Sequence, residues 1–162
     1  MKQNNTILKL GLFLSITCIT MVANDISNKV IPTKHNKDLT ISQLAEIQPG
    51  LGSVMMEFGH RFYIAYYASK AGNWELAEYE IHELLEAQEV AEITRPKYTK
   101  KLKEFEYGAI KELQKAIKKK DWELFKTNYA NTTNRCNSCH KDTGHPYIKY
   151  KLPREAPKFL EL

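Results

Sequence analysis

The sequence has little excess charge, and it contains no hydrophobic run as long as a typical membrane-spanning helix. Its 24 basic and 19 acidic residues give a formal charge of +5 over 162 residues. The excess is small and scattered, so the basic face that binds nucleic acid is not expected. Internal repeats and low-complexity segments are also lacking, and the 43% hydrophobic content suits one globular domain and excludes a largely disordered protein.

The first residues have the pattern of a secretory signal peptide. Lys2 and Lys9 form a basic start, and an uncharged, largely apolar run from Leu10 to Ala23 ends in small residues. At roughly 14 residues this run is shorter than the about 20 that cross a bilayer, and an uncleaved membrane anchor is the alternative. Removal of residues 1–23 leaves 22 basic against 19 acidic residues and also removes Cys18, whose neighbours match a lipidation signal poorly. We therefore expect export to a bacterial periplasm.

The two remaining cysteines belong to one short motif, Cys136-Asn137-Ser138-Cys139-His140. Two cysteines three positions apart, followed directly by histidine, have the spacing of covalent c-type haem attachment. The two thiols add to the vinyl groups of haem as thioethers, and the adjacent imidazole is the proximal iron ligand. On a helix, Cys136, Cys139 and His140 share one face. The motif therefore predicts one haem c, attached through the two cysteines and ligated by the histidine.

Two other interpretations of the paired cysteines compete with haem. A thioredoxin-type redox pair usually follows a strand in an alternating strand and helix pattern, which this sequence lacks. A zinc site needs further cysteine or histidine ligands at regular spacing, and only His145 is close. An exported chain whose remaining cysteines both lie in the motif favours haem.

Apolar residues recur at three- and four-residue intervals in four segments, which predicts four helices. They cover about residues 49–71, 73–94, 97–120 and 121–140. Local signals mark their limits: Asn73 and Asp121 as N-caps, Gly72 and Pro96 as breaks, and Gly108 as a kink. Short connections between helices of this length predict an all-α chain, an antiparallel up-down-up-down four-helix bundle over residues 49–145.

The segments on either side of the predicted bundle carry few packing signals. Residues 24–48 are rich in Asn, Ser, Lys and Pro and are expected to form a flexible segment, with a short helix from Thr40 to Ile47. Residues 146–162 contain Pro153 and Pro157 among basic residues, so they are expected to form an extended tail along the bundle, whose cations would meet the haem propionates.

The position of the haem motif late on the fourth helix resembles the class II c-type cytochromes, the cytochrome c′ group. A second resemblance, to small bacterial periplasmic monohaem cytochromes, rests on residues 49–56 (PGLGSVMM), 71–77 (AGNWELA) and 79–83 (YEIHE). Together these resemblances cover residues 49–145. They imply a bundle with one haem near the end of the fourth helix, and bundles of this kind often form homodimers through their first helices.

The ligand on the other side of the iron separates electron carriers, which have an axial methionine, from gas-binding proteins, whose site is open or hydrophobic. Met55 shares the main apolar stripe of the first helix with Phe58 and Phe62, and it is either a ligand or a core filler. Met56 and His60 share another ridge about 100° around that helix. The candidates are thus Met55, Met56, His60 or none, and we expect Phe58, Phe62 and Tyr129 to form the pocket wall.

Two functions follow from these alternatives. The first is a periplasmic one-electron carrier that exchanges electrons with periplasmic redox partner proteins. The second is a five-coordinate haem protein that binds or senses nitric oxide or carbon monoxide. An enzyme is not predicted, because peroxide reduction needs a distal acid–base pair, and only His60 with Arg61 offers one, side by side and so on different faces.

Overall fold

The computed structural model describes residues 26–34 and 38–162, and these residues are predominantly helical. The predicted leader at residues 1–23, Cys18 and His35 lie outside the described residues. The chain divides into two compact units, one ending at Glu46 and one running from Ile47 to Leu162. Each unit is described by itself, and the second, called the helical unit below, contains the predicted haem motif.

The first unit contains short elements only. A 3-10 turn, η1 (Ile26–Asn28), precedes two antiparallel strands, β1 (Val30–Ile31) and β2 (Leu39–Thr40), which lead into the helix α1 (Ile41–Glu46). The start of α1 is closed by a reciprocal cap, because the backbone N–H groups of Thr40 and Gln43 each donate to the other's side chain at 3.0 and 3.1 Å. The small sheet departs from the purely helical expectation, because two-residue strands are too short to produce an alternating pattern.

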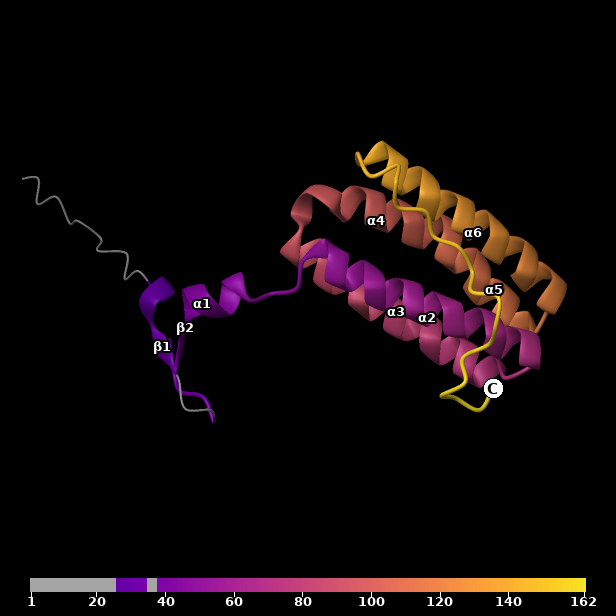
Figure 1. Cartoon of the computed structure of the whole chain (residues 1–162), viewed down its shortest axis with the longest axis horizontal. Coiled ribbons are helices and arrows are strands. Elements are labelled where there is room, and N and C mark those ends of the chain that lie inside the picture. The colour runs from indigo at the N-terminus through magenta and orange to yellow at the C-terminus, as the bar shows by residue number, and fades with distance from the viewer. Residues whose placement is uncertain (1–25, 35–37) are drawn as a thin grey trace, which may run out of the picture. The chain divides into compact units, whose positions relative to one another are not determined.

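The helical unit consists of four long helical segments that run in alternating directions (Figure 1). The first two are α2 (Leu51–Ala71) and α3 (Trp74–Thr94). The third is composite and joins a 3-10 turn η2 (Pro96–Tyr98), α4 (Thr99–Phe105), a π-helical segment η3 (Glu106–Ile110) and α5 (Lys111–Lys119). The fourth is α6 (Trp122–Asp142), which carries the motif cysteines.

The limits of these helices follow from local chemistry. Gly72 ends α2 with φ of 84°, a left-handed conformation that glycine adopts without steric cost. The side chain of Asn73 then accepts a hydrogen bond from the Leu76 N–H at 3.1 Å and starts α3. Asp121 caps α6 in the same way through the Leu124 N–H at 3.0 Å. Both predicted N-caps are therefore confirmed.

The cap at Asp121 gives a stability prediction for the helix that carries the motif. Replacing Asp121 with alanine removes the acceptor for one N–H at the start of α6, so we expect the free energy of unfolding to fall by about 1 kcal/mol. Asp121→Asn keeps an oxygen acceptor and should stay near the wild-type value. Chemical denaturation followed by circular dichroism measures both. Equal losses in the two variants would contradict the capping role.

The core of the helical unit lies between α2, α3, α5 and α6. α2 packs along α3, α5 packs against α6, and both α2–α6 and α3–α5 pairs are in contact. The largest side chains in the core with almost no exposed area are Phe62 and Phe125, which come from α2 and α6. None of the helices that the structure describes has the length and hydrophobicity of a membrane-crossing segment.

The third segment departs from a regular helix where α6 approaches it. Gly108 lies in the middle of the π-helical segment η3, and the guanidinium of Arg135 occupies the place where a Cβ of residue 108 would lie. The absence of a side chain at Gly108 thus lets Arg135 reach across from α6. The sequence predicts a kink here, and the structure resolves it as one turn of π-helix.

Residues 146–162, called the C-terminal strap below, contain neither helix nor strand and run back along the helical unit (Figure 1). The hydroxyl of Tyr63 donates to the Glu155 carbonyl oxygen at 2.8 Å, and that of Tyr67 donates to the Pro153 carbonyl oxygen at 2.9 Å. Two tyrosines of α2 therefore tie the far half of the strap to the helices.

Candidate functional site

Cys136, Cys139 and His140 lie in the last turns of α6, on the continuation of its buried face. Phe125, Tyr129 and Thr132 are buried on this face. Cys136 follows Thr132 by four residues and so continues the stripe toward the helix end. Both cysteines are partly buried and carry free thiols.

The surroundings of the thiols disfavour an activated cysteine. Burial raises the pKa of Cys136 to about 12, and the neighbouring Cys139 sulfur adds to the rise. Burial also raises the pKa of Cys139, although Lys101 opposes the shift. Redox-active cysteines need a lowered pKa, because the thiolate is the reacting form. This pair therefore lacks the electrostatics of a thioredoxin-type site.

The imidazole of His140 is held by the chain that follows α6. Its Nδ1 lies 3.0 Å from the carbonyl oxygen of Ile148. A carbonyl oxygen only accepts, so in this bond Nδ1 carries the proton and Nε2 of the neutral ring keeps a free lone pair. Metal-ligating histidines have the same arrangement, because the bond to the second nitrogen sets the tautomer and raises the basicity of the ligating one.

Phe62, Tyr129 and Tyr150 form an aromatic cluster, and the phenols of Tyr129 and Tyr150 lie within electrostatic reach of Cys136. Phe62 of α2 stacks on Tyr129 of α6 with ring centroids 3.9 Å apart and planes 9° apart. The Tyr129 and Tyr150 oxygens are hydrogen-bonded at 2.8 Å, and Tyr150 belongs to the C-terminal strap. Burial raises the pKa of Tyr150 to about 12, and that of Tyr129 rises for the same reason, so both phenols stay protonated at neutral pH.

The stacked rings define the register between α2 and α6, which run in opposite directions (Figure 1). Phe62 lies opposite Tyr129. Seven residues toward the start of α2 and seven toward the end of α6, about two helical turns in each case, lie Met55 and Cys136, which therefore occupy similar levels along the two helices. Met55 is partly buried and packs against both hydrophobic clusters of the helical unit. Phe58, one turn further on, is 6% exposed and packs against Phe105 of α4 at 5.7 Å between ring centroids.

The other candidate ligands on α2 face away from the core. Met56 is 77% exposed. His60 is exposed, and its ring stacks on Phe159 of the C-terminal strap at 5.5 Å between centroids. Arg61 forms ion pairs with three carboxylates, those of Glu57, Glu80 and Glu83. The two side chains thus have different partners: His60 contacts the C-terminal strap, and Arg61 contacts carboxylates of α2 and α3.

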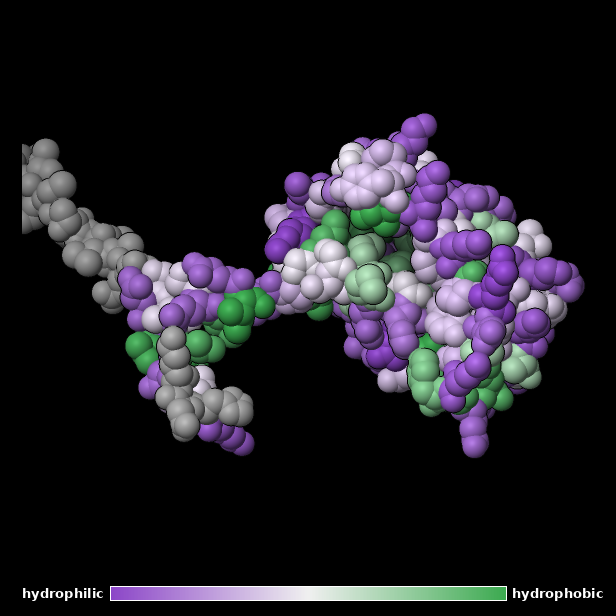
Figure 2. Space-filling model, viewed as in Figure 1, coloured by the Kyte–Doolittle hydropathy of each residue, from purple (hydrophilic) through white to green (hydrophobic). Residues whose placement is uncertain are grey.

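A pocket of about 220 Å³ borders Cys139 between α4 and α6. Phe105 contributes an apolar wall and Arg135 a cationic one; the other lining residues are Lys101, Glu104, Ser138 and Asp142. In the space-filling view, hydrophobic side chains are visible inside a hollow at the end of the helical unit where α6 ends (Figure 2). Ligand sites commonly have roughly 300–1,000 Å³, so a macrocycle bound here would need neighbouring side chains to rearrange.

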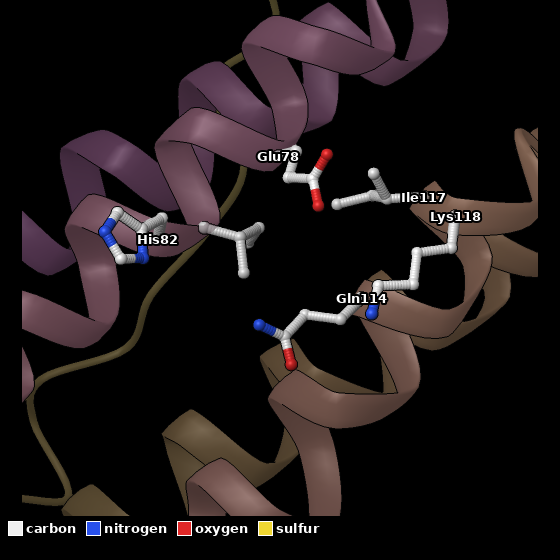
Figure 3. Close-up of a pocket in the computed structure, with 6 residues that line it drawn as sticks. Glu78, His82, Gln114, Ile117 and Lys118 are labelled. Carbon is white, nitrogen blue, oxygen red and sulfur yellow. The ribbon is translucent and has the colours of Figure 1, made fainter.

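A second pocket, of about 230 Å³, lies between α3 and α5 and shares no residue with the motif (Figure 3). Its floor is formed by Ile81 and Ile117, and polar side chains of Glu78, His82, Gln114 and Lys118 surround it. His82 is paired with Glu86 at 3.2 Å and is largely exposed. This pocket contains none of the predicted site residues.

Several site residues are not apparent from the sequence. Asn137 and Ser138 are predicted only as spacers, yet the Asn137 side chain binds the backbone of Tyr150. Tyr150 and Ile148 lie in a segment without helical periodicity, and Arg135 both lines the pocket and approaches Gly108. Tyr150 is one of three aromatic residues in the tail, with Tyr147 and Phe159, and the sequence does not distinguish it from the other two.

No family model matches the chain, and neither the curated proteins nor the solved structures contain a match to it. Over residues 26–34 and 38–162, no group of three or more His, Cys, Asp and Glu side chains is arranged to hold a metal ion.

Proposed function

We propose that this protein is an exported monohaem c-type cytochrome, a four-helix bundle with one haem c attached through Cys136 and Cys139. His140 is the proximal ligand. The observation that carries the proposal is the hydrogen bond from His140 Nδ1 to the Ile148 carbonyl, because it leaves Nε2 free to bind iron in a motif with haem-attachment spacing. Two free thiols on the same face of α6 complete the set of groups that the cofactor needs.

The haem supplies the exchange of one electron, and the protein supplies its position and surroundings. His140 is oriented by the Ile148 carbonyl. The buried stack of Phe62 and Tyr129 would form an apolar wall. Lys101 and Arg135, which line the pocket beside Cys139 together with Glu104 and Asp142, could bind carboxylates such as the propionates. The proposed role is one-electron transfer between periplasmic redox partner proteins.

The position of Met55 supports it as the sixth ligand, because its side chain packs against the core at a level similar to that of Cys136 while Met56 is exposed. The alternative function, binding or sensing of nitric oxide or carbon monoxide, draws support from the buried Phe58 and Phe62, which would give an open distal side a hydrophobic lining. In that case Met55 is part of the pocket wall only.

Absorption spectra of the reduced protein with and without carbon monoxide separate the two functions. A low-spin spectrum that does not change with the gas supports the electron carrier. A high-spin spectrum that shifts on addition of carbon monoxide supports the gas-binding protein and excludes methionine as a tight sixth ligand.

Met55→Ala is expected to open the sixth coordination position. A thioether stabilises ferrous iron, so its loss should lower the reduction potential by on the order of 0.1 V, a part of the roughly 0.8 V range that axial ligands cover. The spectrum should become high-spin and respond to carbon monoxide. Met56→Ala is the matched control and should change neither property, because the Met56 side chain is exposed. Identical spectra for Met55→Ala and wild type would refute the assignment.

A further inference from the structure

Asn137, a spacer residue inside the motif, holds the C-terminal strap with both ends of its side-chain amide. Its Nδ2 donates to the Tyr150 carbonyl oxygen at 3.2 Å, and its Oδ1 accepts from the Tyr150 backbone N–H at 2.7 Å. The two bonds resemble the paired N–H and C=O contacts between neighbouring β-strands, with a side-chain amide in place of one strand. They fasten the strap to the motif at one backbone position.

Tyr150, the residue that Asn137 holds, is two residues from Ile148, whose carbonyl oxygen is hydrogen-bonded to His140 Nδ1. On its other side, Ile148 is held by its N–H, which donates to the His145 carbonyl at 3.0 Å. The backbone N–H of His145 in turn donates to the His140 carbonyl at 2.8 Å. The Ile148 carbonyl therefore has two supports, the turn that ends α6 and the Asn137 clamp.

Other strap contacts do not duplicate the clamp. The Tyr129–Tyr150 hydroxyl bond restrains the side chain of Tyr150, whereas the Asn137 bonds restrain its backbone. The bonds from Tyr63 and Tyr67 act further along, at Glu155 and Pro153. Asn137 is thus the contact that restrains the strap backbone on the C-terminal side of Ile148, nearest to the bond on His140.

We propose that Asn137 is a positioning residue, which keeps the Ile148 carbonyl on His140 Nδ1 and thereby keeps the reduction potential of the bound haem low. This inference rests on the proposed function. A hydrogen bond from Nδ1–H makes the imidazole a stronger donor, and a stronger donor favours ferric over ferrous iron. Loss of the clamp frees the strap, weakens this bond and raises the potential.

The test has a structural and an electrochemical part, both on the haem-loaded protein purified from the periplasm. In Asn137→Ala, the Tyr150 amide loses its acceptor, and its hydrogen exchange should accelerate about tenfold or more. Asn137→Asp keeps an oxygen that accepts from that amide but places its second oxygen against the Tyr150 carbonyl oxygen, so exchange should lie between the rates of the alanine variant and the wild type. Alanine favours helix at position 137, so the variant should keep α6 intact.

Redox titration followed by absorbance measures the second part. Asn137→Ala should stain for haem as the wild type does and have a higher reduction potential, whereas Asn134→Ala, an exposed asparagine one turn earlier on α6, should leave the potential unchanged. An unchanged potential or unchanged Tyr150 exchange in Asn137→Ala would overturn the inference. A wild-type protein without covalent haem would instead overturn the proposed function, and with it the effect on the potential, while the exchange result would still decide the clamp.

Discussion

Replacing Cys136 and Cys139 together with alanine is expected to abolish the haem signal that the wild-type protein keeps after denaturation. The thioether bonds survive denaturants, whereas the iron–histidine bond does not, so covalent attachment is the only link that a denaturing gel preserves. Each single replacement leaves one thioether and should weaken the stain. His140→Ala should keep attachment in part but change the spectrum, since it removes the proximal ligand.

Asn134→Ala serves as the control for the cysteine replacements, because it lies exposed on the same helix and should keep the full stain. The expected contrast is therefore complete loss against no loss, on one gel. Haem that stays on the double cysteine variant through denaturation would show that attachment uses other residues. Loss of haem from the control as well would show that α6 as a whole is sensitive to substitution.

Deleting residues 1–23 is expected to give haem-free protein with low stability. In bacterial systems that read this motif, the thioethers form outside the cytoplasm, so the proposed haem attachment requires the predicted leader. Apo protein also lacks the apolar contacts of the cofactor. Loss of the apolar surface that the haem would bury against the helices should therefore lower the free energy of unfolding relative to the haem-loaded protein.

An unrelated secretory leader in place of residues 1–23 is the matched control and should restore both haem and stability. Haem staining and thermal unfolding of the three proteins provide the comparison. Full haem loading of the leaderless protein in the cytoplasm would contradict the export requirement and the periplasmic localisation that follows from it.

The helices could be predicted because their signals are local. Gly72, Asn73 and Asp121 act on backbone groups within a few residues, and the structure places helix ends at these positions. The π-helical segment could not be predicted in the same way. It coincides with the contact between Gly108 and Arg135, which are distant in sequence, and no local pattern encodes that contact.

Some residues of the candidate site could likewise be predicted from local sequence, whereas others depend on tertiary contacts. Helical phase alone separates Met55 from Met56, and the structure places the first against the core and the second on the surface. The contacts of the C-terminal strap depend on tertiary structure: the Ile148 carbonyl on His140 and the Tyr150 backbone on Asn137 join irregular chain to α6. A proline-containing segment without helical periodicity offers no sequence pattern that identifies the helix it will contact.

The most direct test of the central claim is a haem stain of the wild-type protein on a denaturing gel, after production with a periplasmic haem-attachment system, together with its intact mass. The proposal predicts a stained band and a mass increase of one haem per chain. A protein that loses all haem on denaturation, or that is isolated with zinc in its place, would contradict haem attachment at Cys136 and Cys139.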